Sequence, residues 1–212
     1  MPPNMKRVHV FALVAFSVVV ITSFVWWRVL VTRRNELDDL YAFASGGDLT
    51  SVRRLAEYRS PGATERLVRL AQERNVSPDS RIAAIKTLEG KPFFDRDTLR
   101  PLLWIGQPFD VRHAAAEVLE RTGCDERCIS ATLNALHAIW KGEPTLEVQL
   151  TAQLPSATLH AQEHLAILHK EAENDYLSLL NIDVCLTRRV LQTDYSSEPA
   201  FIDEIRKKLR PC

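Results

Sequence analysis

Residues 109–123 read F-D-V-R-H-A-A-A-E-V-L-E-R-T-G, and this stretch decides the fold class. A second copy of its pattern lies 31 positions upstream. Each copy is too short and too rich in alanine to bury a core alone, and a repeat of this period is typical of stacked helix pairs. We therefore predict an all-α fold, an α-solenoid. The coinciding positions are Asp79 with Asp110, Arg81 with Arg112, Ala83 with Ala114, Ala84 with Ala115, Leu88 with Leu119, and Glu89 with Glu120.

Amphipathic patterns continue on both sides of this repeat. Apolar residues recur at a helical spacing of i, i+3, i+4 and i+7, as they do from Leu37 to Ala44. Glycine or proline separates the segments, as at residues 46–47 and 60–62. We predict helices over residues 36–45, 49–59, 63–75, 77–89, 95–105, 109–123, 125–141, 144–154, 159–180, 182–193 and 199–209.

Residues 99–123 resemble a HEAT-type repeat, and residues 63–90 match the same pattern more weakly. The resemblance implies helix pairs stacked into a curved solenoid, a fold that usually serves as a protein-binding scaffold. The matching residues are Leu99, Pro101, Leu102 and Leu103 in a first helix, and Val111, Arg112, Ala114, Ala115, Ala116, Glu117, Leu119 and Gly123 in a second.

Asp110 and Arg112 allow two interpretations. In one, they bond one repeat to the next through a charge-assisted contact. In the other, Asp110 caps the helix and Arg112 lies on a solvated face. The sequence leaves both open.

Residues 8–27 form a 20-residue apolar run, V-H-V-F-A-L-V-A-F-S-V-V-V-I-T-S-F-V-W-W. A helix of this length spans the roughly 30 Å hydrocarbon core of a bilayer. Trp26 and Trp27 suit its interface, and Arg28 can extend its charge into the head-group zone. We predict an uncleaved single-pass signal-anchor helix over residues 8–31 that contacts the lipid bilayer.

A cleaved signal peptide is the competing interpretation of this run. The run exceeds the usual h-region of about 7–15 residues, and no small-x-small cleavage site closes it. The orientation is nearly balanced, because basic residues lie on both sides of the run. We predict a cytoplasmic tail of residues 1–7 and an exported, periplasmic or extracytoplasmic domain. That domain comprises HEAT-like repeats over residues 36–154 and a C-terminal helical cap over residues 155–212.

The net charge of zero hides an asymmetry along the chain. Five basic residues and no acidic residue precede Asn35, so 22 basic and 27 acidic residues follow. An acidic soluble part lacks the basic face that nucleic acid requires. We therefore predict no nucleic-acid partner.

His160, Glu163 and His164 form an H-x-x-E-H motif. On a helix it places two imidazoles on one face beside a carboxylate, the zinc-binding arrangement of inverted zincins. A solvated helix face explains the same residues, since the motif is short. We favour the solvated face and predict no metal and no cofactor.

The four cysteines are Cys124, Cys128, Cys185 and Cys212, and none has zinc-finger spacing. In an oxidising compartment we expect the pairs Cys124–Cys128 and Cys185–Cys212. In the cytosol they would be small buried hydrophobic residues.

We predict a protein that is not an enzyme, but a membrane-anchored scaffold that binds an unidentified protein partner. A subunit of a larger membrane complex and a zinc-dependent hydrolase using the H-x-x-E-H motif are the alternatives. The predicted partner-binding side chains lie along the second helices of the repeats: Arg54, Lys86, Glu89, His113 and Glu117.

Overall fold

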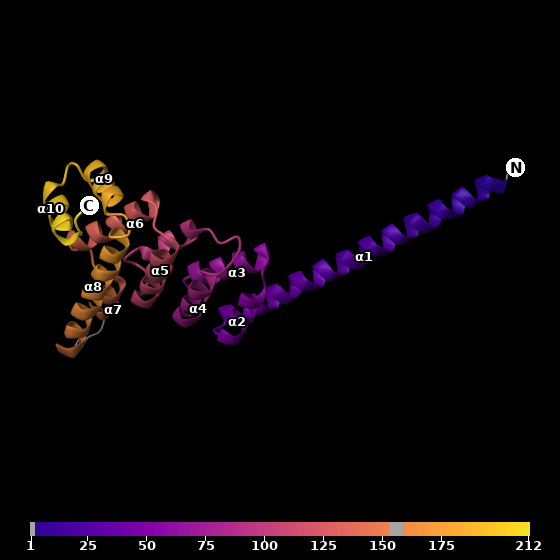
Figure 1. Cartoon of the computed structure of the whole chain (residues 1–212). Helices are drawn as coiled ribbons and strands as arrows, with labels where there is room; N and C mark the ends of the chain where they lie inside the picture. Colours follow the sequence, from indigo (N-terminus) through magenta and orange to yellow (C-terminus); the bar gives the residue numbers. More distant parts are fainter. Residues whose placement is uncertain (1–2, 153–158) are drawn as a thin grey trace.

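The protein is helical throughout the part of the chain that the computed structural model describes, which is residues 3–152 and 159–212, with side chains for residues 19–150 and 166–212. No strand occurs among these residues, so the predicted all-α class is confirmed. In chain order the elements are α1 (Pro3–Ser45), α2 (Leu49–Glu57), α3 (Pro61–Gln72), α4 (Pro78–Leu88), the 3-10 helix η1 (Arg96–Leu103), α5 (Phe109–Thr122), α6 (Glu126–Trp140), α7 (Leu146–Ala152), α8 (Leu159–Leu180), α9 (Val184–Asp194) and α10 (Pro199–Lys208) (Figure 1).

Helix α1 projects from the domain as a long rod (Figure 1). Its last turns bury Leu37, Leu40 and Ala44 in the core, where α1 contacts α2 and α3. The sequence predicted separate helices over residues 8–31 and 36–45. Residues 32–35 contain neither glycine nor proline, so nothing interrupts the helix between them. The rod and the first helix of the domain are therefore one continuous element.

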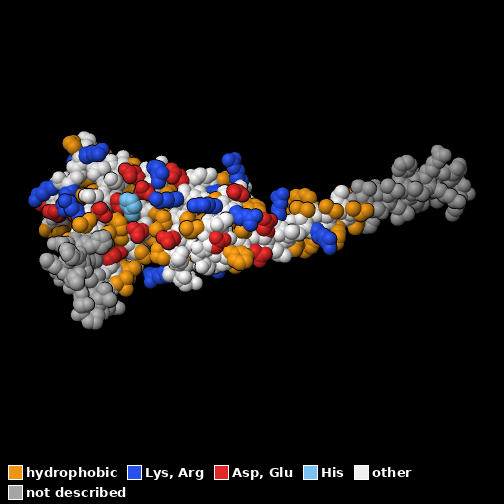
Figure 2. Space-filling view, turned by 90° about the horizontal axis from the view of Figure 1, so that it is seen from below, with side chains coloured by type: hydrophobic (Ala, Val, Ile, Leu, Met, Phe, Trp, Pro, Cys, Tyr) orange, Lys and Arg blue, Asp and Glu red, His pale blue; other side chains and the backbone are white. Residues whose placement is uncertain are grey.

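Apolar side chains, with a few basic ones among them, occupy the face of the rod that Figure 2 shows beyond the domain. Phe24, Trp26 and Trp27 are each more than 60 % exposed. Among the residues whose side chains the structure describes, no helix is both long enough and apolar enough to cross a membrane. Residues 8–18 of the predicted span lie outside that set. The membrane anchor therefore stays a prediction.

The domain consists of two rows of helices. The first-helix row is the end of α1 followed by α3, η1, α6 and α9, each in contact with the next. The second-helix row is α2, α4, α5 and α8, again in contact in that order. One hydrophobic core fills the space between the rows and includes residues from Leu37 to Leu209. Each helix pair is thus stabilised by its neighbours along the stack.

Arg81 and Arg112 occupy equivalent positions in the two sequence copies, and both are buried. Arg81 donates from Nε to the carbonyl of Ala71 at 2.9 Å and from Nη2 to Oε1 of Gln107 at 2.7 Å. Ala71 lies near the end of α3, where helix carbonyls lack partners of their own. Because Gln107 belongs to the following helix pair, Arg81 joins one pair to the next.

Arg112 bonds the loop that precedes its own helix. Its Nη1 donates to the carbonyls of Ile105 at 3.0 Å and Gln107 at 2.6 Å, and its Nη2 lies 3.3 Å from Oε2 of Glu147 on α7. The bonding interpretation of Arg112 is therefore right, and the solvated one is wrong. Asp110 is exposed on the first turn of α5, whose N-cap is Pro108 and has no side-chain capping bond, so the predicted capping by Asp110 is wrong.

The segment predicted as a helix over residues 95–105 forms the 3-10 helix η1 instead. Pro101 lies inside it and has no N–H to donate to an i−4 carbonyl. The buried residues Leu99 and Leu102 are three apart, which suits the three residues per turn of a 3-10 helix.

The C-terminal helices complete the far end of the stack (Figure 1). Tyr176 of α8 is 1 % exposed, and its hydroxyl donates to the carbonyl of Leu103 at 2.5 Å. Phe201 of α10 is fully buried among the aromatic rings of His137 and Tyr195. The hydrophobic core therefore continues from the preceding helices into the C-terminal ones.

Candidate functional site

The structure brings four of the five predicted partner-binding residues together on the second-helix row. Lys86 of α4 and Glu89, which directly follows α4, lie beside His113 and Glu117 of α5, whereas Arg54 is exposed on α2. We call this surface the ion-pair face. It also includes Arg121 of α5 and Asp175 of α8.

Side chains of the ion-pair face neutralise one another. Lys86 lies 3.4 Å from Glu117, and Arg121 lies 3.3 Å from Glu89, so α4 and α5 are joined by opposite charges. His113 Nδ1 lies 2.8 Å from Oδ2 of Asp175 and joins α5 to α8. These contacts connect adjacent helices of the stack and leave the face with little uncompensated charge.

Asp175 is held in an unusual environment on this face. Burial raises the pKa of its carboxyl above 3.8, and the hydrogen bond from His113 opposes that shift. The carboxyl therefore resists ionisation more than an exposed aspartate does.

A hollow lies on the first-helix row, between η1 and α6. We call it the η1–α6 cleft; its volume is about 900 Å³, which is within the range of ligand sites. Its walls come from the α3–α4 loop, η1, the loop before α5, α6 and the loop after α6. The lining residues are Arg74, Asp97, Arg100, Pro101, Trp104, Gln107, Arg127, Ser130, Ala131, Asn134, His137, Ala138 and Glu143.

Guanidinium groups from three different elements converge on this cleft. Asp97 pairs with Arg100, and it lies 3.5 Å from Nη1 of Arg127, so one carboxylate serves two arginines. Arg74 lies in the α3–α4 loop, and no ion pair to it occurs within the described part of the chain. The three arginines outnumber the single carboxylate of Asp97 that pairs with them, so this end of the cleft is positively charged.

Arg81 adds to this positive field from behind the wall. It donates to the cleft residue Gln107, and burial, followed by repulsion from Arg74, lowers the pKa of the Arg81 guanidinium from its usual value. An anion in the cleft would be attracted to both charges.

Trp104 supplies an apolar wall beside the arginines. Its side chain remains 43 % exposed although it follows the buried Leu103. A Cβ on Gly106 would lie 3.3 Å from the Cδ1 atom of this indole, so glycine lets the ring approach the backbone closely. Tryptophan and arginine are the residue types most enriched among the dominant contacts of protein interfaces.

His137 lies at the other end of the cleft. Its Nε2 lies 2.7 Å from Oε2 of Glu198, and Lys141 Nζ lies 3.1 Å from Oε1 of the same carboxylate. The hydrogen bond with His137 is the main cause of the lowered pKa of Glu198, and the contact with Lys141 lowers it further. Ring contacts with Tyr195 and Phe201 fix the imidazole, so this end of the cleft is preorganised.

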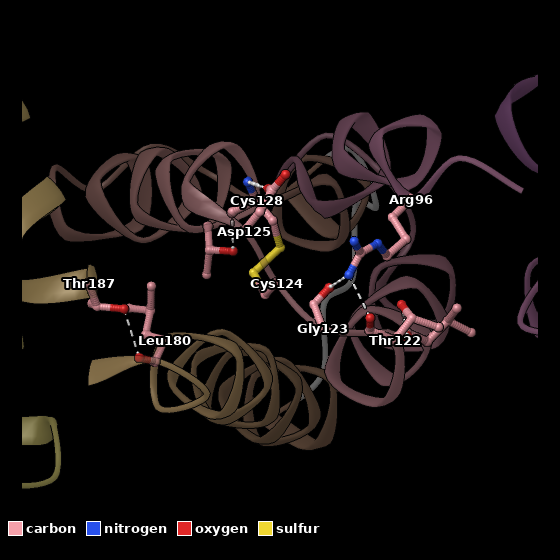
Figure 3. The surroundings of a disulfide bond; sticks show 10 residues. Arg96, Thr122, Gly123, Cys124, Asp125, Cys128, Leu180 and Thr187 are labelled. Carbon is pink, nitrogen blue, oxygen red and sulfur yellow. Dashed lines mark hydrogen bonds between the residues drawn. A yellow bond between two sulfur atoms is a disulfide. The ribbon is translucent and has the colours of Figure 1, made fainter. Parts of the chain in front are cut away.

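All four cysteines form disulfides, in the pairs Cys124–Cys128 and Cys185–Cys212. Figure 3 shows the first pair at the start of α6, where Asp125 caps the helix by accepting from the amide of Cys128 at 2.9 Å. The second pair ties the start of α9 to the C-terminus, and the free-thiol alternative does not apply in this structure.

The H-x-x-E-H side chains, His160, Glu163 and His164, lie outside the described residues. Of the other groups on α8, Glu173 bonds Lys208 at 2.5 Å and Asp175 bonds His113. No three His, Cys, Asp or Glu side chains lie close enough to hold a metal ion in the part of the chain with described side chains. The zinc hypothesis therefore has no structural test here.

The sequence did not identify the η1–α6 cleft. Arg74, Arg100 and Arg127 are far apart in the sequence and share no motif. The available signal was Trp104, an aromatic residue two positions before the Gly106-Gln107-Pro108 turn, where a helix is expected to end. No protein-family model, curated protein or solved structure matches the chain significantly, so the cleft is interpreted from its own geometry.

Proposed function

We propose that the protein is a membrane-anchored helical-repeat scaffold that binds a partner protein through the η1–α6 cleft. The observation that carries this proposal is the convergence of Arg74, Arg100 and Arg127 beside the exposed ring of Trp104. Such a surface suits an acidic segment of a partner that inserts one apolar side chain. The two rows of helices support the HEAT-like interpretation, because successive helices within each row pack against one another along the stack.

The anchor in this proposal is residues 8–31, on the strength of the apolar run and the tryptophans that end it. The two disulfides favour an oxidising compartment for the domain. The N-terminal tail would then lie in the cytoplasm. Alkylation of intact and permeabilised cells tests this topology: an exported domain yields no free thiol in either state, whereas full labelling without reductant would contradict it.

The cleft is tested by quantitative affinity purification of the full chain from native membranes. The cleft variant carries Arg74→Glu and Arg127→Glu, both at exposed side chains. The comparison variant carries Lys86→Glu on the ion-pair face. We expect at least one bound protein to be retained by the wild type and by Lys86→Glu, but depleted about tenfold in the cleft variant.

Circular dichroism of each variant controls for folding, since a general loss of helicity would also lower binding. If every partner survives in the cleft variant and is lost with Lys86→Glu, the ion-pair face is the binding surface. That outcome would refute the assignment to the η1–α6 cleft and would support the surface predicted from the sequence.

A further inference from the structure

A second hollow lies at the base of the rod, between α1 and α3. We call it the base cleft; its volume is about 600 Å³. Its α1 wall is a single helical face, because the contributing residues follow i, i+3, i+4 and i+7 spacing. The lining residues are Leu30, Arg33, Arg34, Leu37, Asp38 and Tyr41 of α1, and Tyr58, Ser60, Gly62, Glu65, Arg66 and Arg69 from α3 and the segment before it.

The base cleft carries four arginines and two acidic residues. Arg66 pairs with Asp38, and Arg69 pairs with Glu73 at 2.7 Å and lies over the ring of Tyr41. Arg33 and Arg34 are exposed, and no ion pair to either occurs in the described part of the chain. Two guanidinium groups are therefore available for an anion at the mouth of the cleft.

The N-terminus of α3 opens into the same cleft. Ser60 is its N-cap, and Ser60 and Gly62 both line the hollow. The partial positive charge of a helix N-terminus attracts phosphate and carboxylate groups. A Cβ on Gly62 would lie 3.2 Å from Nη1 of Arg66, so glycine lets this guanidinium, which donates to the Gly62 carbonyl at 2.9 Å, lie close to the first turn of α3. Side chains of α1 and the N-terminal turn of α3 thus line the same hollow, which suits an anionic group.

An apolar groove continues from the base cleft along the rod. It has a volume of about 380 Å³ and is lined by Thr22, Ser23, Trp26, Trp27 and Leu30. Leu30 belongs to both hollows, so they adjoin. Arg33 follows Trp27 by six residues, or about 9 Å along the helix, and a head-group layer is about 5–8 Å thick. A ligand that is anionic at one end and apolar at the other matches this pair of hollows.

We propose that the base cleft binds the phosphate head group of an anionic phospholipid, whose acyl chains lie along the groove beside Trp26 and Trp27. Arg33, Arg34 and the N-terminus of α3 hold the phosphate, and Leu30 marks the change from polar to apolar contact. This proposal rests on the proposed membrane anchor. A free phosphate ester shares the anionic chemistry but not the apolar groove, and this difference separates the two sources.

The test uses the full chain reconstituted into vesicles of phosphatidylcholine alone or with phosphatidylglycerol. Quenching of tryptophan fluorescence by brominated acyl chains measures which lipid lies beside Trp26 and Trp27. We expect brominated phosphatidylglycerol to be preferred over brominated phosphatidylcholine by about tenfold. The variant Arg33→Gln with Arg34→Gln should reduce this preference to near unity.

The matched control is Arg53→Gln with Arg54→Gln, a second pair of adjacent exposed arginines, on α2 and outside the cleft. An equal loss of preference in both double variants, or no preference in the wild type, would overturn the head-group site. Glycerol 3-phosphate should not abolish the quenching preference at millimolar concentration; if it does, the site takes a free phosphate ester. Failure of the wild type to float with pure phosphatidylcholine vesicles would instead refute the anchor.

Discussion

Gln107 offers the sharpest test of how the helix pairs are joined. Its side chain is 6 % exposed and accepts a hydrogen bond from the buried guanidinium of Arg81. The substitution Gln107→Leu keeps a similar volume but removes this acceptor. A hydrogen bond to a charged group contributes about 1.5–3 kcal/mol, and an unpaired buried charge is more costly than an unpaired neutral group. We expect the free energy of unfolding to fall by about 3 kcal/mol.

The same substitution should cost much less when Arg81 is already absent. Arg81→Met keeps the length of the side chain and removes its charge, so Leu at residue 107 then leaves no guanidinium unpaired. We expect Gln107→Leu to cost about 1 kcal/mol in this background, which gives a coupling energy of about 2 kcal/mol. Urea unfolding of the full chain in detergent, followed by far-UV circular dichroism, measures all four corners of the cycle.

Gln72→Leu is the control for loss of a glutamine hydrogen bond. Gln72 donates to the carbonyl of Thr98 at 2.8 Å and also joins neighbouring pairs, but its side chain is exposed. Water replaces that bond, so we expect a cost below about 1 kcal/mol. An equal cost of Gln107→Leu in the wild-type and Arg81→Met backgrounds would refute the conclusion that this bond couples the two helix pairs.

Three further measurements test other parts of the structure. Gly123→Ala should lower stability by about 2 kcal/mol in thermal unfolding, because Gly123 has a φ of 95° and a Cβ would lie 2.9 Å from Nη1 of Arg96. The lowered pKa of Glu198 means that its stabilisation is present above its ordinary value of 4.5 and is lost as pH falls through the lowered pKa; Glu198→Gln should therefore reduce the melting temperature at neutral pH, and by progressively less as the pH falls below 4.5. Removing the Cys185–Cys212 disulfide, which closes 27 residues, should cost about 3.5 kcal/mol in urea unfolding, against about 2 kcal/mol for the pair four residues apart.

Local rules made the helices predictable from the sequence. Asp48 directly follows the Gly46-Gly47 break and is a favoured N-cap residue, and its carboxylate accepts from the amides of Thr50 and Ser51 at the start of α2. Ser77 directly precedes Pro78, which suits the first position of a helix, and Ser77 caps α4 by accepting from the amide of Ser80 at 3.3 Å. These contacts span two or three residues, so the sequence contains all the information that they require.

The burial of Arg81 and Arg112 was beyond such rules. By residue type alone, arginine belongs on a solvated face. These two are buried because carbonyls at helix ends and in the turn before α5 need donors, and that need depends on how one helix ends against the next. The second copy of the sequence pattern, 31 positions upstream, showed that the two arginines are equivalent, but not that their side chains are buried.

The residues that depart from the repeat are the ones that form the η1–α6 cleft. When Leu99 is aligned with Leu67, Pro101 falls opposite Arg69 and Trp104 falls opposite Gln72, so neither residue is kept in the upstream copy. Pro101 prevents an α-helix, and the tighter 3-10 helix that results presents Trp104 to solvent instead of to the core. The apolar residues that the two sequence copies share, such as Leu88 and Leu119, are buried in the core. A search for function is therefore better directed to the positions where the sequence pattern breaks.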